Sequence, residues 1–85
     1  MTEKLHGDTE FLFKTILSLK DEKQCAAFFE DLCTFKEIEA MAQRLTAAKL
    51  LLAGETYERI TSETDISSAT LSRVSRCVKY GEGYS

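Results

Sequence analysis

The sequence predicts an all-α protein of about five helices, the last two arranged as a helix-turn-helix. The 85 residues contain no proline, so nothing in the chain forbids long helices. Only four glycines are present, and two of them lie among the last five residues. Apolar residues recur at spacings of three and four along much of the chain, as in amphipathic helices. The length and the 44% hydrophobic content fit one globular domain.

Two shorter helices are expected at the N-terminal end. The first covers about residues 9–19, with Asp8 or Thr9 placed to cap it. The second covers about residues 22–32, after Asp21 as its cap. Both carry apolar residues at helical spacing: Leu12, Ile16 and Leu19 in the first, and Cys25, Phe28, Phe29 and Leu32 in the second.

The third and longest helix is expected over about residues 35–53. Thr34 and Glu37 have the spacing of a capping box at its start, and Gly54 stands where a helix commonly ends in a left-handed residue. One apolar stripe runs along it at alternating spacings: Ile38, Met41, Leu45, Ala48 and Leu52.

The first three expected helices carry more apolar side chains than one small domain can bury. These side chains point in several directions: Phe11, Leu12, Phe13, Ile16, Leu17, Phe28 and Phe29. A helix that is apolar over most of its circumference is usually buried on several sides. We therefore expect a homodimer with interlocked N-terminal helices. A compact monomer with a few exposed aromatic residues is the alternative.

The last two helices are expected on either side of a tight turn. Thr56 can cap a fourth helix over about residues 57–63. The turn at 64–65 ends in an aspartate, which tolerates the left-handed conformation better than most residues. One of the serines at 67–68 then caps a fifth helix over about residues 68–79. The apolar contacts of this pair come from Ile60, Ile66, Leu71, Val74 and Val78.

The fifth helix has the side chains that a DNA-reading helix needs. Small hydroxyl residues at its start let the backbone approach the major groove, and arginines can reach phosphate or a guanine edge. The predicted DNA contacts are Tyr57, Arg59 and Thr61 in the fourth helix, and Ser67, Ser68, Thr70, Ser72, Arg73, Arg76 and Lys79 around the fifth.

The charge distribution agrees with a localised nucleic-acid contact. The net charge is −3, so the chain has no general basic coat. Of the 14 acidic residues, all but Glu82 lie at or before Asp65. The charged residues of the fifth helix are therefore all basic.

Three positions depart from the usual helix-turn-helix pattern. Thr61 stands where a smaller residue is preferred, Thr64 where an apolar residue is usual, and Asp65 where glycine is common. The alternative function is therefore a helical protein-interaction module that docks a partner without binding DNA.

Other function classes find little support in the sequence. The single histidine, His6, precedes the first expected helix, and no nucleophile motif accompanies it, so we do not expect an enzyme. Cys25, Cys33 and Cys77 lack the spacing of a zinc site and are expected to be buried, reduced thiols. No signal peptide or membrane span is visible, which indicates a cytoplasmic protein.

From Leu32 to Lys79 the chain resembles the Trp-repressor superfamily, in particular its YerC/YecD-type branch. The matching runs are LCTFKEIEAMAQRLTAAKLLLAGETYERI and ISSATLSRVSRCVKYG. The resemblance implies an intertwined, all-helical homodimer that acts as a transcriptional regulator. We expect a sequence-specific bacterial repressor that binds a palindromic operator. Residues 1–85 would be one domain, with a dimerisation scaffold at 8–54, the helix-turn-helix at 55–79 and a flexible tail at 80–85.

The same resemblance locates a possible effector pocket. Arg44 and Arg73 match the arginines that flank the corepressor tryptophan, and Thr34 matches the threonine beside that pocket. Val74 replaces a glycine, and Cys77 replaces a serine that completes the pocket. The added bulk should cost affinity, which argues against tryptophan. We expect no resident cofactor and leave open another small-molecule corepressor.

Overall fold

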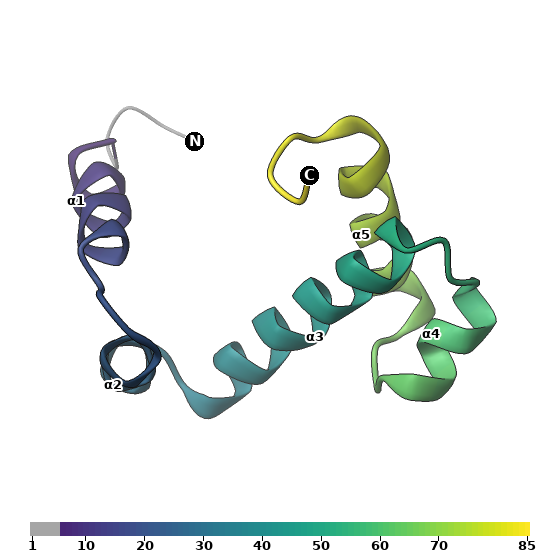
Figure 1. The fold of residues 1–85 in the computed structure, drawn as a ribbon, viewed down its shortest axis with the longest axis horizontal. Coiled ribbons are helices and arrows are strands. Elements are labelled where there is room, and N and C mark those ends of the chain that lie inside the picture. Colours follow the sequence, from purple (N-terminus) through teal and green to yellow (C-terminus); the bar gives the residue numbers. More distant parts are fainter. Residues whose placement is uncertain (1–5) are drawn as a thin grey trace. The chain divides into compact units, whose positions relative to one another are not determined.

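The protein is all-α. The structure is a computed structural model that describes residues 6–85, and this part of the chain contains helices and turns but no strand (Figure 1). The five helices are α1 (His6–Leu17), α2 (Glu22–Leu32), α3 (Phe35–Leu52), α4 (Tyr57–Glu63) and α5 (Ser68–Tyr80). The fold class that the sequence predicts is confirmed.

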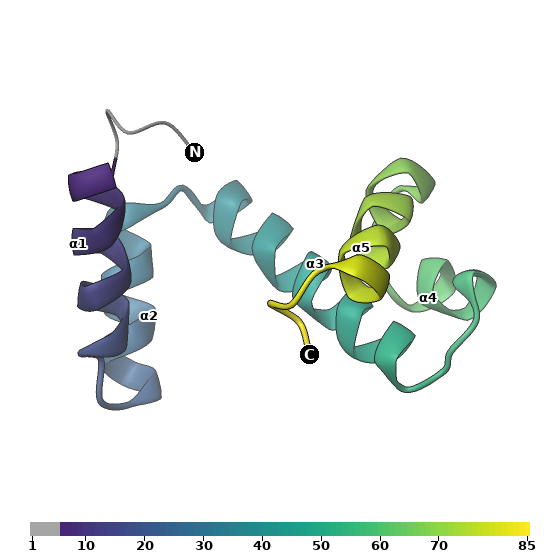
Figure 2. The same cartoon turned by 90° about the horizontal axis from the view of Figure 1, so that it is seen from above.

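The chain divides into two compact units, Met1–Thr34 and Phe35–Ser85. The described part of the first unit holds α1 and α2 (Figure 2). Neither helix has a buried residue. Phe28 and Phe29 of α2 pack edge to face, with ring centroids 5.3 Å apart. This unit therefore has aromatic contacts but no sealed core of its own.

The second unit contains the hydrophobic core. The α3 helix contacts both α4 and α5, and α5 lies against the C-terminal half of α3 (Figures 1 and 2). Ala47 and Ala48 are fully buried at this crossing, where their small side chains allow the helix backbones to approach. The buried cluster consists of Ala47, Ala48, Ile60, Ile66, Leu71 and Val74.

Three of the predicted helix caps are confirmed in the structure. In each, a side-chain oxygen accepts a hydrogen bond from the backbone N–H three residues further on, at 2.8 Å for Asp21 and 3.2 Å for Thr56 and Ser67. These bonds satisfy N–H groups that have no partner inside the helix. The ranges of α2 and α4 agree with the prediction.

The α1 boundaries differ from the prediction at both ends. The helix begins at His6, so His6 lies inside it, and Asp8 and Thr9 lie in its first turn and do not cap it. It ends at Leu17, two residues early, because the next N–H groups shift to partners three residues back. The N–H of Leu19, for example, donates to the Ile16 carbonyl at 3.2 Å, which tightens the last turn.

The turn between α4 and α5 is made without a left-handed residue. Gly54, after α3, has φ 87° as predicted, but no non-glycine residue in the described chain has positive φ, so the expectation for Asp65 is wrong. Thr64 is extended, with φ −128° and ψ 160°, and its hydroxyl donates to the Ile60 carbonyl at 2.9 Å. The N–H of Ile66 donates to the same hydroxyl at 3.4 Å. The hydroxyl therefore bridges the end of α4 and the turn.

The cysteines are less buried than expected. Cys25 and Cys33 are half-buried and Cys77 is exposed, and all three are free thiols. Cys77 lies one turn after Val74, at the edge of the buried face of α5, and the core leaves its side chain exposed.

Candidate nucleic-acid interface

The α5 helix has one buried face and one exposed face. Leu71 and Val74 are 0% and 2% exposed, and Val78 packs against the same core. The opposite face combines small residues near the start of the helix with basic residues near its end. Its exposed members are Ser68, Ala69, Ser72, Arg73, Arg76, Cys77 and Lys79. The packing on α3 thus fixes which side of α5 is available to a ligand.

The hydroxyls at the start of α5 fall into two groups. Ser67 accepts a hydrogen bond from the Thr70 N–H, and its own hydroxyl donates to Thr70 Oγ1 at 3.0 Å. Ser67 and Thr70 are therefore engaged with each other and hold the first turn in place. Ser68 and Ser72 are exposed and remain available to accept or donate a bond to a ligand.

The α4 helix carries the other predicted contacts. Tyr57 is 45% exposed at the first position of the helix. Thr61 is exposed, but its hydroxyl donates to backbone carbonyls one turn back, at 3.1 Å to Tyr57 and 3.0 Å to Glu58. These bonds explain how α4 accommodates a threonine where the helix-turn-helix pattern prefers a smaller residue, because the hydroxyl finds its partners within its own helix.

Arg59 lies between two carboxylates on α4. Its Nε atom is 3.2 Å from Glu55 Oε2 and 3.1 Å from Glu63 Oε1. Both acids are four residues from Arg59, the spacing that brings side chains together on a helix. Arg59 is a predicted DNA contact, and these two ion pairs were not predicted, although their spacing is visible in the sequence. The positive charge on this part of the surface is therefore partly offset.

The charge of the α4–turn–α5 segment is consequently concentrated on α5. This helix has no acid in its first turn, and its exposed charged residues are Arg73, Arg76 and Lys79. Its N-terminus adds the partial positive charge of unpaired backbone N–H groups. The arrangement favours a polyanion that approaches α5 and not α4.

The residues of the predicted effector pocket are spread over the two units. Thr34 ends the first unit, whereas Arg44 on α3 and Arg73 and Cys77 on α5 belong to the second. Val74 points into the core at 2% exposure, so its extra bulk fills space between α5 and α3. The expectation that tryptophan does not bind stays a prediction.

A hollow of about 450 Å³ does lie beside Cys77. Its lining is Leu45, Cys77, Gly81, Gly83 and Tyr84, so neither arginine of the predicted pocket faces it. The contribution of Tyr84 to this hollow was not predicted, because the sequence after position 80 is typical of a flexible tail. Two glycines followed by an aromatic residue were the available signal.

Two further observations concern metal binding and membrane spans in the described residues, 6–85. No group of three or more histidine, cysteine, aspartate or glutamate side chains there is placed to hold a metal ion. No helix in that range is long and apolar enough to cross a membrane.

The fold and this surface define a small, all-helical protein with one exposed basic helix face. The family model for Trp repressor protein matches residues 8–84, and the chain belongs to that family. It is 52% identical over 80 residues to the uncharacterised protein YerC of Bacillus subtilis (strain 168), covering 93% of this chain and 77% of YerC.

Two solved structures share the fold. A crystal structure of a TrpR-like protein from Eubacterium eligens ATCC 27750 is 46% identical, with TM-score 0.90 over 98% of this chain and 88% of that one. A candidate Trp repressor from Staphylococcus aureus is 38% identical, with TM-score 0.88 over the same shares. The resemblance noted in the sequence is thereby confirmed.

Proposed function

We propose that the protein is a transcriptional regulator that binds double-stranded DNA as a homodimer, with α4 and α5 as its helix-turn-helix. The observation that carries this proposal is the division of α5 into two faces. One face is buried on α3, and the other presents small polar residues followed by Arg73, Arg76 and Lys79, with no acid among them. A recognition helix needs one face packed on the rest of the protein and an opposite face of small polar and basic side chains.

The chemistry of the exposed face suits both kinds of DNA contact. Arg73 and Arg76 can bind phosphate or form paired bonds to guanine in the major groove. Ser68 and Ser72 are small enough to let the helix backbone approach the bases, and their hydroxyls can pair with a base edge. Lys79 at the end of the helix is assigned to the phosphate backbone.

The homodimer is supported by the apolar surface of the first unit. Phe11 is 74% exposed, Leu17 is 84% exposed, and no residue of α1 or α2 is buried. Small units are only marginally stable, and exposed apolar patches commonly mark interaction surfaces, so we assign this surface to contact with a second copy of the chain. In the Trp-repressor geometry the two recognition helices lie about 34–36 Å apart, one turn of DNA.

Family membership supports repression as the regulatory action. We propose that the protein acts on a bacterial chromosome in the cytoplasm, a proposal that its similarity to a Bacillus protein supports. A small-molecule corepressor is compatible with the proposal. Tryptophan is disfavoured because Val74 occupies the position at which added bulk narrows the ring slot.

The test begins with selection of bound sequences from a random DNA pool by the purified protein. We expect a palindrome with half-sites about one helical turn apart. The double variant Arg73→Ala with Arg76→Ala should then lose operator binding while remaining folded. Lys20→Ala with Lys36→Ala removes the same charge from exposed positions outside α5 and is the matched control. Equal binding by both double variants would overturn the assignment.

Salt dependence separates this function from the protein-interaction alternative. DNA binding releases counterions, so its affinity should fall steeply as salt rises. Docking of a partner protein on an apolar face should respond little to salt. A failure to select any DNA, together with salt-insensitive capture of a protein partner, would favour the alternative.

A further inference from the structure

The chain reverses direction directly after α5, at Gly81. The Gly81 N–H donates to the Cys77 carbonyl at 2.8 Å and closes the helix. A Cβ atom at position 81 would lie 2.7 Å from that same carbonyl oxygen, closer than real Cβ contacts. At Gly83, in contrast, a Cβ would meet nothing within 4 Å. The tight exit from α5 therefore requires glycine at 81 but not at 83.

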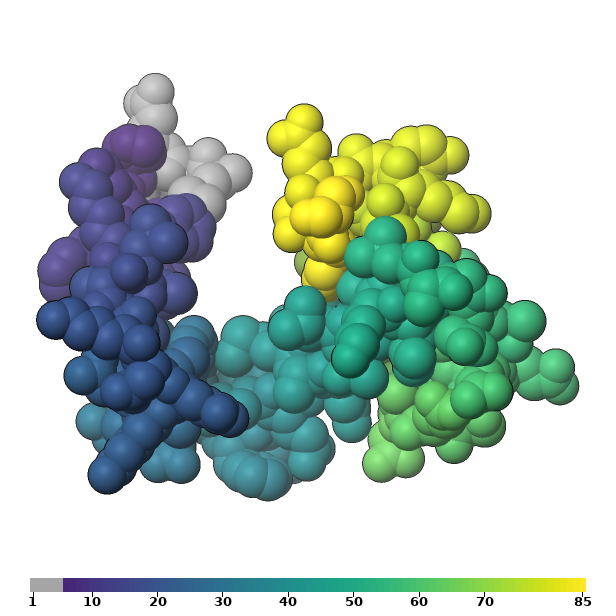
Figure 3. All heavy atoms as spheres, in the orientation of Figure 1, coloured from purple at the N-terminus to yellow at the C-terminus, as the bar shows by residue number. Residues whose placement is uncertain are grey.

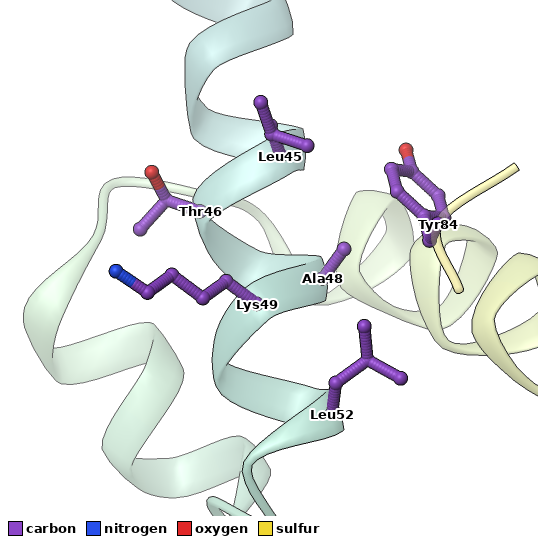
Figure 4. Close-up of a pocket in the computed structure, with 6 residues that line it drawn as sticks. All are labelled: Leu45, Thr46, Ala48, Lys49, Leu52 and Tyr84. Carbon is purple, nitrogen blue, oxygen red and sulfur yellow. The ribbon is translucent and has the colours of Figure 1, made fainter.

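The reversal brings Tyr84 back onto the core. Its ring lines a hollow of about 430 Å³ on α3, facing Ala48 and Leu52 (Figure 4). Tyr84 is half-buried and packs against the buried cluster, whereas Tyr80, on the last turn of α5, is 83% exposed. The yellow C-terminal residues lie against the α3 surface in Figure 3. The same residue type thus occupies two different environments four positions apart.

We propose that Tyr84 is a positioning residue for α5. Residues 81–84, which we call the C-terminal clamp, join the end of the recognition helix to α3. This inference rests on the proposed function and names a residue that contacts no DNA itself. The clamp limits how far the C-terminal end of α5 can swing away from α3.

The position of the clamp gives it this effect. Leu71 and Val74 fix the first half of α5, and Val78 is the last side chain of the helix to reach the core. Arg76 and Lys79 lie near that end, so motion of the last turns moves their charged groups relative to a bound operator. Base contacts depend on such placement, whereas phosphate attraction over a whole surface depends mainly on charge.

Two matched pairs of variants test the clamp. Tyr84→Ala removes the ring from α3, and Tyr80→Ala removes an exposed ring as its control. Gly81→Ala forces the clamp to shift through a backbone clash, and Gly83→Ala adds the same methyl group in open space. Tyr84→Phe keeps the apolar ring and should restore the wild-type behaviour. None of these changes alters the charge of the protein.

The measurement is affinity for the selected operator and for random-sequence DNA at one salt concentration. Tyr84→Ala and Gly81→Ala should bind the operator about tenfold more weakly, the cost of one poor base contact, with unchanged affinity for random DNA. Tyr80→Ala, Gly83→Ala and Tyr84→Phe should match the wild type. Equal operator affinity for Tyr84→Ala and Tyr80→Ala would overturn the inference. An equal loss on both DNAs would also overturn it, because it indicates general destabilisation.

A fluorescence measurement without DNA tests the clamp independently of the proposed DNA-binding function. The chain has no tryptophan, so Tyr84→Trp and Tyr80→Trp each introduce a single tryptophan, which can be excited at wavelengths that the remaining tyrosines do not absorb. The first should emit at shorter wavelength and resist a soluble quencher better than the second. Equal spectra would refute the clamp even if DNA binds. Distinct spectra without any DNA binding would leave the clamp in place and refute the proposed function.

Discussion

The Nε atom of Arg59 lies 3.1 Å from Oε1 of Glu63, and Glu55 approaches the same nitrogen from the other side at 3.2 Å. Arg59 is thus held along its own helix in the free protein. In the proposed complex, DNA phosphate would compete with both carboxylates for this side chain, and the two acids would also repel the phosphate directly.

Removal of one acid should therefore strengthen DNA binding. We expect Glu63→Gln to raise operator affinity about twofold to fivefold, the scale of an exposed ion pair. Glu10→Gln is the matched control, because Glu10 also forms an exposed ion pair, with Lys14 at 2.9 Å, outside the proposed interface. Equal effects of the two variants, measured by titration at low salt, would place Arg59 outside the interface.

The cap of α5 should contribute measurably to stability. Ser67→Ala removes the oxygen that accepts from the Thr70 N–H and should lower the free energy of unfolding by about 1 kcal/mol. Ser67→Asp keeps an acceptor of equal rank and should preserve stability, while its negative charge weakens DNA binding. Urea unfolding monitored by circular dichroism provides the measurement. An unchanged unfolding midpoint in Ser67→Ala would contradict the role of the cap.

The exposed apolar side chains of α1 should control assembly. Phe13 and Leu17 are one helical turn apart and 53% and 84% exposed. Phe13→Gln with Leu17→Gln should shift the protein from dimer to monomer in sedimentation experiments. It should also lower the melting temperature, which for a dimer depends on protein concentration. Lys14→Gln between them is the control, and a wild type that sediments as a monomer would refute the dimer.

Lys79 should contribute to affinity without contributing to sequence preference. Lys79→Gln should reduce the slope of log affinity against log salt by about one per subunit, equally on operator and random DNA. Lys49→Gln, an exposed lysine on α3, should leave the slope unchanged. A Lys79 variant that weakens operator binding alone would mean that Lys79 reads a base.

The helices with strong local signals were predicted well from the sequence. Asp21 and Thr56 are followed by N–H groups that need an acceptor, so they set the starts of α2 and α4 without help from the rest of the fold. Periodicity likewise identified Leu71 and Val74 as the inner side of α5 and left its basic side outward. Those features depend on neighbours within one or two turns.

Features that depend on distant contacts or on competing local bonds were not predicted. Nothing in the periodicity links Tyr84 to Ala48, because their contact joins separate segments of the chain. The left-handed turn expected at Asp65 was replaced by an extended Thr64, whose hydroxyl supplies the bonds that the turn needs. An aspartate permits the left-handed conformation but does not require it.

The two faces of α5 also make the helix suitable for engineering. Leu71, Val74 and Val78 hold the helix on α3, and the exposed positions lie between them in the sequence. A library randomised at Ser68, Ala69, Ser72, Arg73 and Arg76 would vary the presented chemistry while the scaffold stays constant. New operator preferences could then be selected one helix at a time, without redesign of the protein that carries them.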